Sequence, residues 1–116
     1  MIKRKSSYPV QVNERMRDGD GAVTVEHLLT PAELYEKGRL FAKMTFSGFG
    51  ASIGPHILEG EMESFFILCG EAEFYDNGET VRLLPGDTAL TTSGEEHSIR
   101  SVGETPLELI AMILHK

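Results

Sequence analysis

Three residues of types that ligate metal ions lie next to apolar sequence: His56, Glu63 and His97. On strand parity, Glu63 shares a face with Phe65 and Ile67, which would point its carboxylate into the protein interior. A buried carboxylate or imidazole is costly unless it is paired, protonated or bound to a metal. Two histidines and one carboxylate that converge would satisfy one another by binding a divalent metal ion. The alternative without a metal is a buried hydrogen bond between His56 and Glu63.

The other reactive residue types carry less information. His27 is interpreted as structural, and His115, next to the C-terminus, as a solvated surface residue. Glu59 and Glu61 read as a solvated turn, with Glu61 as an alternative oxygen donor at the site. Cys69, in the segment FFILCG, is interpreted as an inert core residue rather than a reactive thiol. A single cysteine cannot form an internal disulfide, so we expect a cytoplasmic protein.

Short strands separated by closely spaced turn residues must position these side chains. The best hairpin signal is Asn77-Gly78, since this dipeptide tolerates the positive φ angles of a type I′ turn. The segments VQVN and AVTVEHLL, near the N-terminus, add one or two further strands. Many short strands with regular turns predict an all-β sandwich or small barrel. The strands expected after residue 38 are 39–49, 51–58, 63–69, 71–75, 79–84, 88–92, 97–102 and 107–114.

One short helix is predicted before these strands. Thr30 can be its N-cap, Pro31 its first residue and Glu33 the partner in a capping box, with Gly38 at its end. We therefore expect an N-terminal arm with strands and a short capping helix over residues 1–38, packed on a barrel formed by residues 39–116.

The strand predicted at Glu63–Cys69 is apolar on both faces. Phe65 and Ile67 occupy one face, and Phe66 and Leu68 occupy the other. A strand at a solvated surface would carry polar residues on its second face, so another element must cover it. A homodimer is the simplest cover in a chain of this size, and the alternative is the short helix.

Composition argues against two classes of partner. The chain has 116 residues, a net charge of −7 and a pI near 5.0. Nucleic acid and anionic membrane both favour cationic proteins, so neither is expected as a partner. The basic cluster Lys3, Arg4 and Lys5 is not followed by the apolar segment of a secretory signal. No apolar run approaches the roughly 18 residues that a membrane-spanning helix needs. We expect neither a secretory signal nor a membrane span.

The spacing of glycines, histidines and the glutamate resembles the two sequence motifs of the cupins. The first motif reads as Gly50, His56, Leu58, Glu63 and Gly70, at the family's spacing. The second motif corresponds to Gly86, Thr92, Gly94, His97 and Ser101. Three of these five positions, Gly86, Gly94 and His97, carry the family's residue. Thr92 and Ser101 stand where the family has proline and asparagine. The resemblance covers roughly residues 40–114, and seven of the ten signature positions match.

This resemblance implies an all-β double-stranded β-helix, the jelly-roll barrel of the cupins. In the family, two histidines and the glutamate of the first motif join the histidine of the second motif around one metal ion. Leu58 replaces the second of those histidines, which leaves His56, Glu63 and His97 as metal ligands. Such a set suits iron, manganese, nickel or zinc, and the ligand types do not discriminate among them.

Two functions are compatible with this resemblance. The first is a small metal-dependent enzyme that acts on a small polar organic molecule in the barrel mouth. The second is a non-catalytic ligand-binding or sensing protein whose metal site is degraded by Leu58. A storage or scaffold protein is a third option, disfavoured by the short chain and the absence of repeats.

Overall fold

Ten strands build the protein, whose structure is a computed structural model that describes residues 1–116. Two short 3₁₀ helices, η1 (Lys5–Ser7) and η2 (Met16–Asp18), precede and follow the first strand. The strands are β1 (Val10–Glu14), β2 (Ala22–Leu29), β3 (Gly38–Phe46), β4 (Ser52–Ile57), β5 (Glu61–Cys69), β6 (Ala72–Asp76), β7 (Glu79–Leu83), β8 (Thr88–Thr91), β9 (Glu96–Ser101) and β10 (Glu108–His115).

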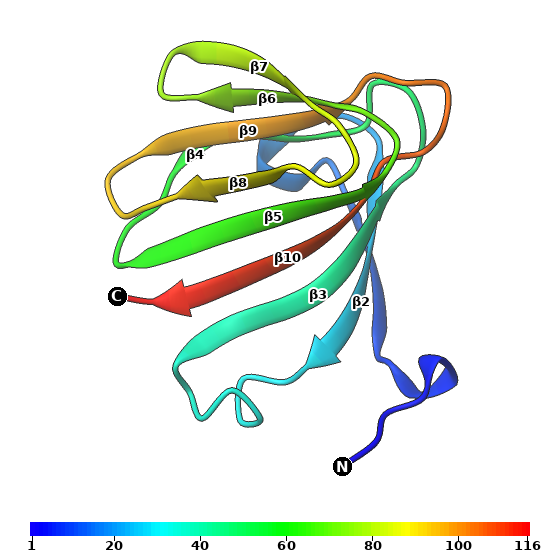
Figure 1. The fold of residues 1–116 in the computed structure, drawn as a ribbon, viewed down its shortest axis with the longest axis vertical. Coiled ribbons are helices and arrows are strands. Elements are labelled where there is room, and N and C mark those ends of the chain that lie inside the picture. Colours follow the sequence, from blue (N-terminus) through cyan, green and yellow to red (C-terminus); the bar gives the residue numbers. More distant parts are fainter.

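The strands form two antiparallel sheets, which Figure 1 shows as the layers of a barrel. One sheet has six strands in the order β1-β2-β3-β10-β5-β8, and the other has four in the order β4-β9-β6-β7. Neighbours that are distant in sequence, such as β3 beside β10, are typical of jelly rolls. The all-β jelly-roll barrel predicted from the sequence is confirmed.

The turn residues end the strands where the sequence indicated. All eight strands expected after residue 38 form, with small shifts at their ends, and both N-terminal segments are strands. Asn77 and Gly78 join β6 to β7 with φ angles of 48° and 98°, the left-handed values that a type I′ turn requires.

The core lies between the two sheets and contains a cluster of 18 buried hydrophobic residues. On β5, Phe65 and Ile67 point into this core and expose only 2% and 1% of their surface. Phe66 and Leu68 point outward and expose 39% and 45%. The strand parity inferred from the sequence is therefore confirmed, and the outer face of β5 exposes two large apolar side chains.

The prediction of a short helix before the barrel, from Thr30 to Gly38, is wrong. The capping box does form, because the Thr30 amide donates to Glu33 Oε1 at 2.8 Å and the Glu33 amide donates to Thr30 Oγ1 at 3.2 Å. The chain then makes only turns, since Tyr35 and Glu36 adopt φ angles of 56° and 58°. Left-handed residues cannot continue a right-handed helix, so the segment connects β2 to β3 as a capped turn.

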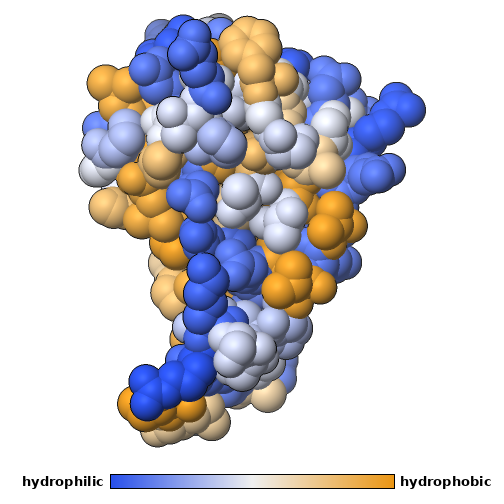
Figure 2. All heavy atoms as spheres, turned by 90° about the vertical axis from the view of Figure 1, so that its right-hand side faces the viewer, coloured by the Kyte–Doolittle hydropathy of each residue, from blue (hydrophilic) through white to orange (hydrophobic).

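The N-terminal strands extend the six-stranded sheet, because β1 pairs with β2 and β2 pairs with β3. Strand β1 is the edge of the sheet, where Val10 and Val12 each expose 61% of their surface. The side of the molecule seen in Figure 2 accordingly shows hydrophobic patches among hydrophilic residues. No helix of the protein has the length and apolar character needed to cross a membrane.

Candidate metal centre

The structure brings together the three side chains that the sequence singled out. His56 on β4 and His97 on β9 are direct partners in the register of the four-stranded sheet. Glu63 lies on β5 of the opposite sheet and points inward with Phe65. One potential ligand atom from each of the three residues lies within 4.8 Å of the others. The site therefore joins the two layers inside the barrel.

Short contacts and burial mark this cluster as a single unit. His97 Nε2 lies 3.1 Å from Glu63 Oε1 and 3.3 Å from His56 Nε2. His97 and Glu63 expose 1% and 6% of their surface, whereas His56 is half-buried and faces a cavity. Three polar side chains in an apolar barrel are costly unless they satisfy one another or a shared ion.

The hydrogen bonds of the outer ring nitrogens suit a metal ion at the centre. His56 Nδ1 donates to the carbonyl oxygen of Gly54 at 2.9 Å, so its Nε2 carries a lone pair. His97 Nδ1 is hydrogen-bonded to the buried hydroxyl of Thr91 at 2.9 Å. Metal-ligating histidines characteristically use their second nitrogen in this way, which orients the ring. The donor set and its surroundings therefore fit a divalent ion.

Aromatic packing holds the ring of His97 in place. Phe65 stacks on this ring with a centroid distance of 5.5 Å and an interplanar angle of 11°. Phe74 meets the same ring edge-on at 5.8 Å and 84°. His97 is thus clamped between β5 and β6, and its Nε2 remains directed at Glu63.

The environment of His56 favours its neutral form. Burial lowers the pKa of His56 below its ordinary value, and the proximity of His97 and of the Arg17 guanidinium lowers it further. The hydrogen bond to Gly54 and the charge of Glu63 act in the opposite direction. A neutral imidazole is the form that ligates metals, so the net shift preserves the ligand at neutral pH.

Leu58, at the position of the family's second histidine, is buried with 3% exposure. Its backbone bonds to the loop before β9: the amide donates to Glu95 O at 3.0 Å, and the carbonyl accepts from Gly94 N at 2.7 Å. The leucine is thus fixed in the structure but offers no ligand atom.

A cavity of about 240 Å³ opens beside His56 and Glu63. Its apolar wall includes Met44 and Ile53. The polar residues at this cavity, apart from the two ligands, all carry hydrogen-bond donors, and they are Gln11, Asn13, Arg17, His27 and Arg39. They come from the N-terminal region and β3, and the sequence patterns did not single out four of them. His27, expected to be structural, lies at this cavity and is 3.3 Å from Gln11 Oε1.

Arg39 is already paired at the cavity wall. Its guanidinium donates to both carboxylate oxygens of Glu61, at 2.8 and 2.7 Å. The hydrogen bond to Glu61 raises the pKa of Arg39, and the same bond lowers the pKa of Glu61. Glu61 is thus the partner of Arg39, rather than a residue of a solvated turn.

Cys69, expected to be a core residue, is half-buried and lies outside the main hydrophobic cluster.

Comparison with known proteins places this geometry in context. The chain matches the cupin domain over residues 44–113. It is 43% identical over 114 residues to an oxalate-binding protein of Thermotoga maritima, covering 98% of this chain and 93% of the relative. The crystal structure of a predicted oxalate decarboxylase from the same organism is 42% identical, with a TM-score of 0.94 and 100% of both chains covered. KdgF from Halomonas sp., 17% identical with a TM-score of 0.76 over 100% of this chain and 94% of that one, shares the fold.

Proposed function

This chain belongs to the cupin family, and on that premise we propose that it holds one divalent metal ion between His56, Glu63 and His97. The observation that carries the proposal is the orientation of the ligand atoms. Both Nε2 atoms lie close together near Glu63, while both Nδ1 atoms bond to the surrounding protein. Iron, manganese, nickel and zinc all accept such a set. A bound ion would act there as a Lewis acid with open positions for oxygen ligands.

We further propose that the ligand is a small carboxylate, with oxalate as the first candidate. The cavity beside His56 has a volume of about 240 Å³, which suits a small molecule. Its polar rim offers donors, and these complement carboxylate oxygens. The oxalate-binding relative, at 43% identity, supports the same choice. A metal-dependent reaction on such a ligand is compatible with this arrangement. The cytoplasmic location expected from the single cysteine stays a prediction.

A second candidate is ligand binding without a metal, which two observations favour. Leu58 removes one ligand of the family's set. In addition, His97 already contacts both Glu63 and His56, so the cluster is satisfied without an ion. In this case the cavity would bind its ligand through the rim residues alone.

Oxalate titration of metal-loaded and metal-free protein separates the two candidates. We expect about one metal ion per chain after purification without chelator, by elemental analysis, and oxalate binding by calorimetry that disappears after chelation. Equal oxalate affinity with and without the metal would favour the second candidate. Metal content at background level, with no oxalate binding in either form, would contradict both.

We also propose that the chain forms a homodimer through the outer face of its six-stranded sheet. Register places Phe66 opposite Ile110, and Ser64 opposite both Met112 and Leu90, so these residues share one face. Phe41 is opposite Met112 and continues the face onto β3. Phe66, Leu68 and Leu90 expose 39%, 45% and 55% of their surface. An apolar face that spans several strands is typical of a subunit interface, and a second copy presents the same face to it.

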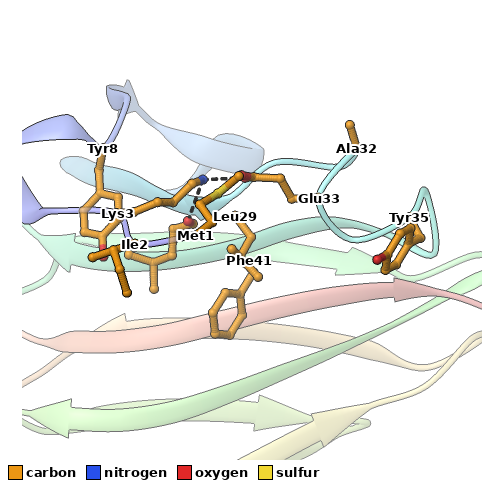
Figure 3. Close-up of a pocket in the computed structure, with 10 residues that line it drawn as sticks. Met1, Ile2, Lys3, Tyr8, Leu29, Ala32, Glu33, Tyr35 and Phe41 are labelled. Carbon is orange, nitrogen blue, oxygen red and sulfur yellow. Dashed lines mark hydrogen bonds and ion pairs between the residues drawn. The ribbon is translucent and has the colours of Figure 1, made fainter.

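The N-terminal arm supports this interface. A groove of about 630 Å³ lies between the arm and β3, with Phe41 at its floor (Figure 3). Lys3 closes one side through its ion pair with Glu33 and its 3.0 Å hydrogen bond to Leu28 O. Ile2 nevertheless exposes 76% of its surface beside the groove. A second copy packed on the outer sheet would cover these apolar side chains.

Phe66→Glu is expected to weaken the dimer at least about thirtyfold, because a charge would be buried among the apolar side chains of the proposed interface. Sedimentation velocity over a concentration series measures the change. Val81→Glu is the matched control, since Val81 is a similarly exposed hydrophobic residue, at 43%, on the other sheet. A monomeric parent protein, or equal effects of both substitutions, would contradict the proposed interface.

A further inference from the structure

A turn between β1 and β2 has an unusual backbone. Arg15, Arg17 and Asp18 adopt φ angles of 52°, 52° and 61°, in the left-handed region that residues with a side chain rarely occupy. Each such residue costs free energy and persists only where the surrounding structure holds it. Such conformations concentrate at functional sites, so the side chains on this turn merit a functional test.

Two features hold the turn in place. The amide of Arg15 donates to the carbonyl of Gly21 at 2.9 Å, which closes the base of the turn. The backbone of Arg17 packs against Gly54 so closely that a Cβ atom at residue 54 would lie 2.0 Å from the Arg17 carbonyl oxygen. The carbonyl of Gly54 in turn accepts the hydrogen bond from His56 Nδ1. One glycine thus anchors both the Arg17 turn and the proposed metal ligand.

Arg17 lines the same cavity as His56 and Glu63. Its guanidinium forms no ion pair and no hydrogen bond within the protein, whereas Arg39 at the same cavity is bound by Glu61. An unpaired guanidinium at a cavity is available to a ligand.

The balance of charged groups at the cavity differs from that of the whole chain. The protein carries 18 acidic residues against 11 basic ones. Only one acidic residue, Glu63, lines this cavity, and it is a proposed metal ligand. Arg17, Arg39 and His27 line the same space. Because Glu61 neutralises Arg39, Arg17 is the cationic group at this cavity that remains free to attract a small anion.

We propose that Arg17 forms an anion subsite that receives the second carboxylate of a small dicarboxylate whose first carboxylate lies at the metal centre. The inference rests on the proposed function. It adds that Arg17 makes the site bind dicarboxylates more tightly than monocarboxylates. A guanidinium suits this role because it offers paired donors in the geometry of a carboxylate. The packing against Gly54 fixes the backbone of Arg17 beside the cavity before the ligand arrives.

Arg17→Gln and Arg15→Gln, loaded with Mn²⁺, provide the test. Both residues lie on the same turn, are exposed and have left-handed backbones, but only Arg17 lines the cavity. We expect Arg17→Gln to weaken oxalate binding roughly tenfold to hundredfold by calorimetry, and formate binding by less than about threefold. Arg15→Gln should leave both affinities unchanged. Arg17→Lys should recover part of the oxalate affinity, because charge remains without the paired donors.

The outcomes distinguish this inference from the proposed function. Equal oxalate affinities for both glutamine variants, with the parent binding well, would overturn the role of Arg17 and leave the metal site intact. Equal losses for oxalate and formate in Arg17→Gln would overturn the selection of dianions. A parent that takes up neither Mn²⁺ nor iron, nickel or zinc would contradict the proposed metal centre. In that case the role of Arg17 is tested on the metal-free protein. Oxalate should raise the Tm of the parent but not that of Arg17→Gln, and equal shifts would overturn the role of Arg17.

Discussion

His97→Ala is expected to abolish metal binding and to destabilise the metal-free protein. His97 contacts both other members of the proposed site, so its loss should lower metal affinity by at least about 100-fold. The substitution also leaves Glu63, which is 6% exposed, without its partner inside the barrel. Leaving a buried acceptor without its hydrogen-bond partner costs about 1–3 kcal/mol of folding free energy. Elemental analysis and denaturant unfolding measure the two effects.

Two further histidine variants make this prediction decisive. His56→Ala should also lose the metal but retain more stability, because the pair of His97 and Glu63 stays intact. His115→Ala is the control, since His115 is exposed near the C-terminus and outside the cluster. Undiminished metal content in both His56→Ala and His97→Ala would contradict the proposed ligand set, whatever their stability.

Gly54→Ala is expected to destabilise the protein by about 1–3 kcal/mol, the usual cost of overpacking. The added methyl group would lie 2.0 Å from the Arg17 carbonyl oxygen and 3.1 Å from the Gly19 amide nitrogen. Both neighbours are backbone atoms, so the clash is relieved only if the turn moves away from β4. Because Arg17 moves with its turn, we expect weaker oxalate binding as well. Denaturant unfolding and calorimetry measure these changes.

Gly103→Ala is the matched control for this substitution. Its Cβ atom would meet Glu71 at 3.6 Å, an ordinary van der Waals distance. We therefore expect a change in the free energy of unfolding within about 0.5 kcal/mol. If Gly54→Ala were equally mild, the contact between the Arg17 turn and β4 would be looser than described.

Local rules were sufficient for most of the fold. Each predicted strand is bounded by residues whose turn preference is intrinsic, and Asn77-Gly78 adopts the expected left-handed angles. The alternation of Phe65 with Phe66 correctly separated the inner from the outer face of β5, because side chains alternate strictly along a strand. The same signals failed after Thr30. A capping box specifies how a helix can begin, but the link from β2 to β3 required left-handed residues at Tyr35 and Glu36.

The sequence by itself identified the family, the barrel and the three residues His56, Glu63 and His97, because their spacing is a property of the chain alone. Only the tertiary structure brought Arg17 to their cavity. Its left-handed turn and its packing on Gly54, 37 residues away in sequence, are long-range features with no local signature. The net charge of −7 gave no indication of this subsite, since composition averages over the whole chain and a folded cavity samples only a few residues.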